Sequence, residues 1–351
     1  MRRHIAAALL LVIAIGSNRA LLGVSRARWT PQPSGGTASL RGVSAVSDSI
    51  AWASGSGSTV LRTIDGGKTW QPQTVTSDRL DFRDVDAIDA RTAYLLSIGN
   101  GPASRIYKTT DAGATWRLQY TNQDPKGFLD AMAFWDAAHG VAVGDSVNGA
   151  FSILLTADGG KTWTPAPAGG LPPALANEGA FAGSGTNVTV HGANEAWFAT
   201  GAAAKSRVLH TSDRGRTWTV ADTPLGAGPS TGAFSVAFRD AMHGVVVGGD
   251  YQKEADATDN LAVTSDGGRT WTLVKERKLS GFRSLVSYVP GTKMSLVAVG
   301  PQGSDWSDDD GRSWTPIEGP GFHTLSLSKS GRVGFGAGGK GAIGRLEISA
   351  R

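Results

Sequence analysis

The sequence repeats one phrase six times, from Thr63-Ile-Asp-Gly-Gly-Lys-Thr-Trp70 to Ser307-Asp-Asp-Asp-Gly-Arg-Ser-Trp314. The copies between these two span residues 109–116, 156–163, 211–218 and 264–271. Successive copies place their tryptophans 46, 47, 55, 53 and 43 residues apart. A repeat of about 40 to 55 residues is the length of one blade of a β-propeller. The period therefore predicts an all-β fold built from blades.

Each copy has a hydroxyl residue, an Asp two residues later, a Gly after two more and a Trp three further on. Asp accepts hydrogen bonds from nearby backbone amides, and Gly allows a positive φ, so the phrase predicts a tight hairpin turn. This spacing resembles the Asp-box, or BNR repeat, of sialidases and their non-enzymatic relatives. The six aspartates are accordingly expected to build turns and to have no catalytic role.

The number of blades follows from a second repeat. A short apolar run ending in Gly precedes every phrase, as at residues 51–55 and 141–144, and a seventh run at 333–338 has no phrase after it. Trp29-Thr-Pro31 resembles the strand that follows a phrase, Trp163-Thr-Pro165. Residues 28–33 are therefore expected to supply the missing outer strand of blade seven. The prediction is one domain over 28–351, a seven-bladed propeller with four antiparallel strands per blade, closed by its N-terminal strand.

The first 27 residues have the composition of a signal peptide. Basic residues precede an apolar run at 5–15, and Ser25-Arg-Ala27 is a small-x-small cleavage site. Cleavage after Ala20 and an uncleaved membrane anchor remain alternatives, although the run is short for a membrane span. The expected location is the periplasm or the cell exterior, without stable membrane insertion once the leader is removed.

Charge and cysteine content narrow the function classes. The chain has 34 basic and 30 acidic residues, and four of the arginines lie in residues 1–27, so the remainder is balanced at 34 − 4 = 30 against 30. This balance gives no support for nucleic-acid binding. There is no cysteine, and no His, Asp and Glu cluster has metal-ligand spacing. No cofactor or metal is predicted, and we expect a monomer.

The start of each inner strand should face the mouth of the central channel, opposite the phrase turns. An apolar residue is followed there by a variable one, and asymmetric charge around such a ring is what a specific ligand needs. Ordinary solvated residues around a water-filled channel are the alternative. The seven variable positions are Arg41, Arg83, Asp130, Ala182, Ser235, Arg283 and His323.

Loops on the same face supply further candidates. The longest, residues 248–260, is rich in polar groups, and long loops on a rigid scaffold tend to carry function. Surface loops without a ligand are the alternative. The candidates are Asp250, Tyr251, Lys253, Asp259 and Asn260 in that loop, Arg105 and Arg207 at the start of third strands, and Glu178 in the entry loop of blade four.

The phrases, the Val-Gly and Trp-x-x-x-Gly second strands and the leader together resemble the photosystem II stability/assembly-factor-like propellers of the sialidase superfamily. The resemblance covers residues 28–350 and implies a non-catalytic assembly factor that binds a protein partner. Sialidases use three arginines to bind the substrate, a Tyr-Glu pair as nucleophile and an Asp as general acid/base. The chain lacks their Arg-Ile-Pro motif. The expected function is a binding module for a protein or a small polar or anionic ligand. A glycan-active hydrolase using the same mouth is the alternative, and no nucleotide or haem motif supports an oxidoreductase.

Overall fold

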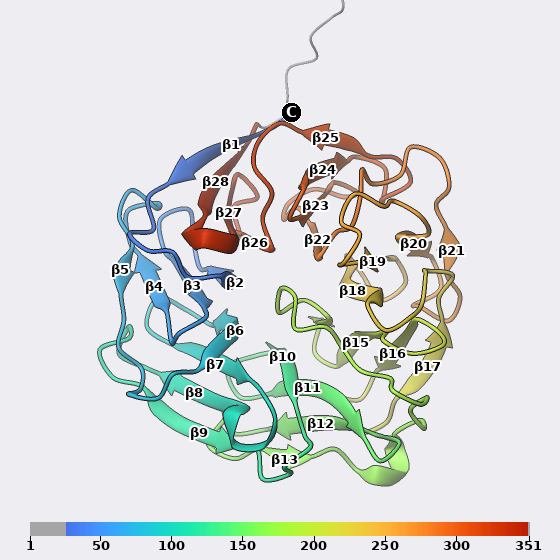
Figure 1. Cartoon of the computed structure of the whole chain (residues 1–351), viewed down its shortest axis with the longest axis horizontal. Coiled ribbons are helices and arrows are strands. Elements are labelled where there is room, and N and C mark those ends of the chain that lie inside the picture. Colours follow the sequence, from blue (N-terminus) through green and yellow to red (C-terminus); the bar gives the residue numbers. More distant parts are fainter. Residues whose placement is uncertain (1–25, 350–351) are drawn as a thin grey trace, which may run out of the picture.

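The computed structural model describes residues 26–349, so the expected signal peptide lies outside the described residues except for its last two positions. The described residues form seven four-stranded antiparallel sheets arranged in a ring (Figure 1). The predicted fold class is therefore confirmed, with seven blades and four strands in each. Between the strands of residues 26–349 lie three short 3₁₀ turns, at Gly101–Ala103, Ala168–Gly170 and Gly339–Gly341.

In blades one to six the strands run outward from the centre in chain order, and in blade seven the outermost strand comes from the N-terminal end. Blades one to four comprise β2 (Leu40–Ala45), β3 (Ala51–Gly55), β4 (Val60–Thr63), β5 (Gln71–Pro72); β6 (Asp81–Ala87), β7 (Ala93–Ile98), β8 (Arg105–Thr109), β9 (Arg117–Thr121); β10 (Leu129–Phe134), β11 (Gly140–Val147), β12 (Ala150–Thr156), β13 (Thr164–Pro165); and β14 (Val188–His191), β15 (Glu195–Thr200), β16 (Arg207–Thr211), β17 (Thr219–Asp222). Blades five to seven comprise β18 (Thr231–Phe238), β19 (Gly244–Asp250), β20 (Leu261–Thr264), β21 (Thr272–Leu273); β22 (Leu285–Tyr288), β23 (Leu296–Gly300), β24 (Gly303–Ser307), β25 (Thr315–Ile317); and β26 (Thr324–Leu327), β27 (Val333–Ala337), β28 (Ile343–Ile348), with β1 (Ala27–Gln32) outermost.

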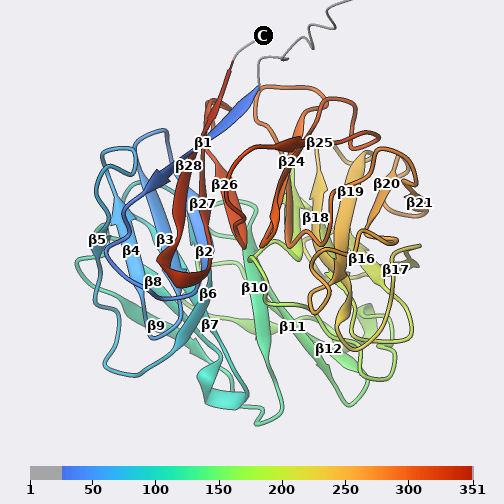
Figure 2. The ribbon, with the colours of Figure 1, turned by 45° about the horizontal axis from the view of Figure 1, so that its top comes forward.

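Ring closure follows the sequence-based prediction. Strand β1 pairs antiparallel with β28 from Ala27 opposite Ile348 to Gln32 opposite Ile343. The indole of Trp29 is buried against Phe322 with ring centroids 4.4 Å apart. Figure 2 shows β1 lying along the outer side of the last blade. The N-terminal strand therefore completes the blade that the C-terminal end of the chain leaves unfinished.

The six phrases form turns with the same hydrogen bonds. In the first, the Thr63 hydroxyl donates to Asp65 Oδ1 at 2.8 Å, and the Thr69 N–H and hydroxyl donate to the same carboxylate at 3.0 and 2.7 Å. These hydrogen bonds favour the charged form and lower the pKa of Asp65 to about 2. In three copies the Trp indole also donates to a carbonyl of its own turn, as Trp218 does to Gly215 at 2.9 Å. These aspartates are therefore occupied within the turns.

The apolar core is divided among the interfaces between neighbouring blades. Seven clusters of buried side chains each join one blade to the next. Between blades two and three, Tyr94 stacks on Phe134 at 4.1 Å, and Trp163 packs edge-on against the same ring at 5.9 Å. Each phrase tryptophan thus joins the face of its blade to the preceding blade.

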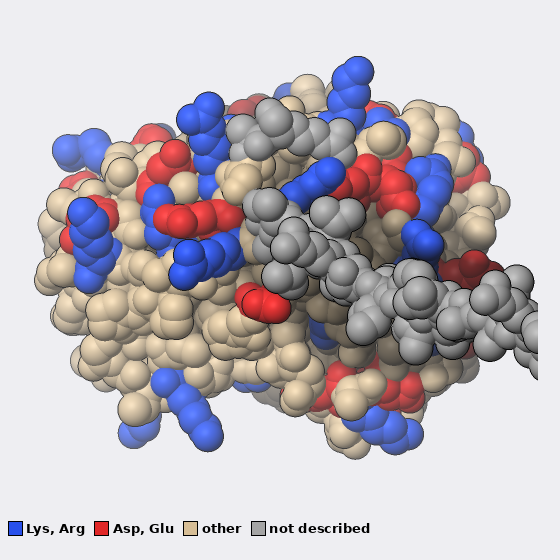
Figure 3. All heavy atoms as spheres, turned by 90° about the horizontal axis from the view of Figure 1, so that it is seen from above, with Lys and Arg blue, Asp and Glu red and all other residues tan. Residues whose placement is uncertain are grey.

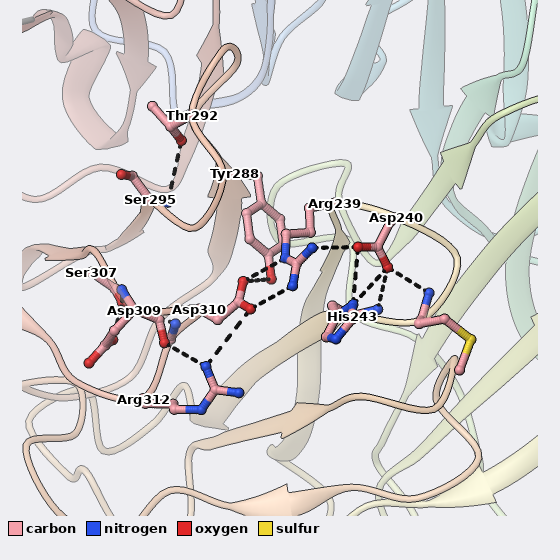
Figure 4. Close-up of polar contacts among 12 residues, drawn as sticks. Arg239, Asp240, His243, Tyr288, Thr292, Ser295, Ser307, Asp309, Asp310 and Arg312 are labelled. Atoms are coloured by element: carbon pink, nitrogen blue, oxygen red, sulfur yellow. Dashed lines mark hydrogen bonds and ion pairs between the residues drawn. The ribbon is translucent and has the colours of Figure 1, made fainter.

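Polar contacts on the phrase-turn face also join blades (Figure 4). Arg239 follows β18 in blade five, and its guanidinium donates two hydrogen bonds of 2.9 Å to Asp310 in the phrase of blade six. The Tyr288 hydroxyl donates to the same carboxylate at 3.1 Å. Asp310 has a φ of 63°, at a phrase position where three other copies carry Gly and two carry Ala112 and Arg214. The Asp310 side chain therefore links blade six to blade five from a turn position with left-handed backbone.

The outer surface has no dominant charge where Figure 3 displays it. Basic and acidic side chains lie interspersed on this edge of the ring. Among residues 26–349, no helix is long and apolar enough to cross a membrane.

Candidate functional site

A segment of blade four crosses the central channel. Figure 1 shows the yellow-green chain before β14 reaching into the middle of the ring. Its Ser184 hydroxyl donates to the carbonyl of Ser284 in blade six at 2.8 Å, and the Thr324 hydroxyl of blade seven donates to the Ser184 carbonyl at 3.0 Å. Arg83 of blade two donates to the Ala182 carbonyl at 3.1 Å. We call residues 181–187 the plug, because hollows lie on both sides of it.

The mouth is the hollow on the side away from the phrase turns, with a volume of about 430 Å³. It combines a cationic side, a carboxyl side and an aromatic wall. Six of its lining residues were predicted from the sequence: Arg41, Arg83, Asp130, Ala182, Tyr251 and His323. Inner strands, the plug and the loop after β19 therefore meet at this mouth.

The cationic side contains Arg41, Arg83 and His323. Arg83 Nε donates to Asp81 at 2.8 Å, whereas Arg41 Nε has no hydrogen-bond partner within residues 26–349. Burial, and then the charge of Arg83, lower the pKa of Arg41 to about 10. Burial and the two arginines lower the pKa of His323 to about 4, so this imidazole is neutral at pH 7. Arg41 is charged and incompletely paired, which favours an anionic ligand group beside it.

The carboxyl side is formed by Asp130 and Asp145. Asp130 is 1% exposed, and its Oδ2 has no hydrogen-bond partner in the described part of the chain. Burial, followed by repulsion from Asp145, raises the pKa of Asp130 well above its ordinary value. Asp145 accepts a hydrogen bond from the Ala180 N–H at 2.9 Å, and burial raises its pKa as well. This side of the mouth is thus less negative than two ordinary aspartates would make it.

The aromatic wall faces the polar groups. Phe181 of the plug and Phe234 of β18 stack in parallel with centroids 3.9 Å apart. Tyr251 lies edge-on to both rings, at 6.0 and 6.1 Å, and is 44% exposed. Phe282 packs edge-on against Phe234 at 4.7 Å. An apolar group of a ligand can therefore lie beside the arginines without leaving the hollow.

Three predicted site residues lie outside the mouth, where they form ion pairs. Arg207 Nε donates to Glu178 at 2.8 Å, and both side chains are buried beneath the surface of blades three and four. Arg105 pairs with Asp78 at the rim of blade two. Glu178 lines a separate shallow hollow. The structure thus does not bring Glu178, Arg207 or Arg105 to the cationic side.

Most of the loop after β19 also lies outside the mouth. The Asn260 amide is buried and donates to the Gly281 carbonyl at 2.7 Å, and Lys253 lies 3.7 Å from Asp250. Asp259 is exposed, with a left-handed φ of 43°. Tyr251 alone among the five loop candidates lines the mouth.

The predicted ring alignment is wrong by one residue in blade five. In blade two the inner strand bulges at Arg83, and the equivalent bulge in blade five falls at Phe234. Ser235 is consequently buried, and its Oγ accepts a hydrogen bond from the Val286 N–H at 3.0 Å. Because a bulge shifts side chains by one position, the aromatic residue faces the mouth.

The alignment is also wrong in blades four and six. Ser284 lines the mouth in blade six, whereas Arg283 is 1% exposed and lies 2.6 Å from Asp305. In blade four the inner strand begins at Val188, and Ala182 belongs to the plug. Sequence reasoning also missed Asp145, although its position directly after the Val-Gly of a second strand could have indicated it.

The fold and the mouth define a seven-bladed β-propeller with a plugged channel. No protein-family model and no curated protein matches the chain. Among solved structures, it is similar to YCF48 bound to D1 peptide, with 19% identity, a TM-score of 0.64 and 94% of this chain and 99% of that chain covered. YCF48 from Cyanidioschyzon merolae gives 16% identity, a TM-score of 0.65 and coverage of 91% and 99%.

A GH74 xyloglucanase from Xanthomonas campestris gives 16% identity and a TM-score of 0.65. The match covers 91% of this chain but 53% of the xyloglucanase, so the chain spans about half the length of that protein. The suspected resemblance to assembly-factor-like propellers is confirmed as a likeness of fold.

Proposed function

We propose that this chain is an exported, monomeric binding module that holds a segment of a protein partner in the mouth. The observation that carries the proposal is the incompletely paired Arg41 beside Arg83, in one hollow with an aromatic wall whose outermost ring, Tyr251, is exposed. A peptide carrying an acidic side chain next to an apolar one is complementary to this arrangement. The similarity to YCF48 bound to D1 peptide supports a peptide ligand over a small anion.

Peptide binding to purified protein tests this proposal. A fluorescent library of peptides with and without Asp or Glu is titrated into the wild type, Arg41→Gln and Tyr251→Ala. We expect peptides with an acidic residue to bind, and Arg41→Gln to weaken them at least about tenfold, or ~1.4 kcal/mol. Arg91→Gln, in an exposed turn on the opposite face, is the matched control. Equal binding by Arg41→Gln and the wild type would exclude the mouth as the site.

Glycan hydrolysis is a second candidate function. The fold likeness to a xyloglucanase and the presence of Asp130 and Asp145 in one hollow favour it. Glycosidases need two carboxyl groups about 5 to 10 Å apart, one of which donates a proton to the leaving group. Burial of Asp130 and the pairing of Glu178 with Arg207 argue against these two carboxyls as a catalytic pair. Turnover of fluorogenic glycosides that disappears in Asp145→Asn would replace the binding proposal.

A further inference from the structure

Besides the mouth, the same face of the ring has a hollow of about 870 Å³ at blade one. The connection from β1 to β2 forms one side through residues 34–38, and the β3–β4 loop and residues 79–81 form the other. We call this hollow the blade-one groove. It is the larger of the two hollows and lies outward from the centre of the ring.

The groove is lined largely by backbone and small side chains. Gly35, Gly36 and Gly57 are among its lining residues. The backbone N–H groups of Gly35, Thr37 and Gly57 have no hydrogen-bond acceptor among residues 26–349. Free backbone donors are suited to the carbonyl groups of a second extended chain. The exposed Arg79 adds positive charge above Gly57.

The groove adjoins the mouth. Leu40 and Asp81 line the groove, whereas Arg41 and Arg83 line the mouth. The ion pair between Asp81 and Arg83 spans the boundary, with side chains 30% and 26% exposed. Asp81 Oδ1 and Arg41 Nε are both buried at this boundary without a partner in the described structure. The protein therefore leaves the hydrogen-bonding capacity of these two side chains incompletely satisfied between the two hollows.

We infer that the mouth and the blade-one groove form one continuous site for an extended peptide. The inference rests on the proposed function, because the acidic residue of the peptide lies between Arg41 and Arg83. The chain on one side of that residue then runs outward over Gly35 and Gly36. A glycan fits the groove less well, because its aromatic residue, Trp70, is only 7% exposed and offers no stacking face.

Gly36 allows this path to be blocked without strain. A Cβ at Gly36 meets no atom within 4 Å, and its φ is not in the left-handed region, so Gly36→Trp places an indole in the groove without forcing the backbone. Gly169 has the same two properties and lies in a 3₁₀ turn that lines neither hollow. Gly169→Trp is therefore the matched control. Thr37→Trp fills the groove from an exposed neighbouring position.

The probe is a phage-displayed library of random twelve-residue peptides, long enough to span about 40 Å when extended. Clones selected on the wild type are measured on Gly36→Trp, Thr37→Trp, Gly169→Trp and Arg41→Gln. We expect both groove variants to weaken the clones at least about tenfold. The control should leave them unchanged. Four-residue versions centred on the acidic residue should bind the wild type and the groove variants equally.

Clones that are weakened by Arg41→Gln but unaffected by both groove variants would overturn the groove and leave the mouth assignment intact. If Arg41→Gln leaves the binding of the selected clones unchanged, both the groove inference and the assignment of the mouth as the binding site are overturned. Melting temperatures of the two groove variants within the range of the Gly169→Trp control exclude unfolding as the cause of lost binding. Loss of the four-residue peptides in the groove variants would show a disturbed mouth and would also contradict the inference.

Discussion

The ion pair between Arg283 and Asp305 allows a structural role to be separated from a binding role. Both side chains are 1% exposed. Arg283 Nε donates to Asp305 at 2.7 Å, and its Nη1 donates to the Phe282 carbonyl at 2.8 Å. Ser280 donates to Asp305 at 2.9 Å and accepts a hydrogen bond of 2.6 Å from Arg283. The guanidinium is thus bound to internal partners beneath blade six.

Asp305→Leu leaves this guanidinium buried without its counter-charge. Removing one partner of a buried ion pair costs about 3 to 5 kcal/mol, whereas replacing both partners by apolar residues of similar size is close to neutral. We therefore expect Asp305→Leu to lower the free energy of unfolding by about 3 kcal/mol or more. The double variant Arg283→Met with Asp305→Leu should recover most of that loss.

Urea denaturation followed by circular dichroism measures both free energies. Binding of the phage-selected peptides to the double variant should equal that of the wild type, since Arg283 does not line the mouth. A loss below about 1 kcal/mol in Asp305→Leu, or a double variant no more stable than the single one, would refute the structural role. Lost peptide binding in a stable double variant would restore Arg283 to the site.

Three further predictions concern stability. Trp29→Ala, which removes the indole packed on Phe322, should lower the free energy of unfolding by about 3 to 5 kcal/mol in urea; an effect below about 1 kcal/mol would contradict closure by β1. Burial raises the pKa of Asp86 from 3.8 to about 6, so its carboxyl reduces stability as pH rises from about 4 to 6. Asp86→Asn should therefore gain on the order of 1 to 3 kcal/mol at pH 8 and little at pH 3, and an equal gain at both pH values would refute this. Arg239→Met should cost about 1 to 3 kcal/mol through the unpaired Asp310, and the same cost in an Asp310→Gly background would show that the two residues are not coupled.

The sequence was sufficient to predict the ring and its closure, because these depend on local signals repeated in phase. Six turn phrases set the blade period, and Trp29 could be recognised by its likeness to Trp163. Long-range contacts were not predictable in the same way. Nothing in the sequence near Arg283 indicates that Asp305 lies within hydrogen-bonding distance. The sequence alone therefore does not distinguish a buried, ion-paired arginine from a ligand-binding one.

The error in blade five has a local physical cause. A bulge changes which side chain faces the channel, and its position depends on the pairing of the inner strand with the second strand of the same blade. Ser235 was therefore predicted at the mouth, where the structure places Phe234. The plug could not be recognised either, because residues 181–187 make their contacts with blades distant in sequence.

The plug has a consequence for how this propeller could change over evolutionary time. Blades that touch only their neighbours can be duplicated or deleted, since each new junction resembles the old ones. Here residues of one blade contact blades two, six and seven across the centre. A ring with one more or one fewer blade would have a different diameter, and these contacts would no longer reach. The segment that divides the channel thus ties this protein to seven blades.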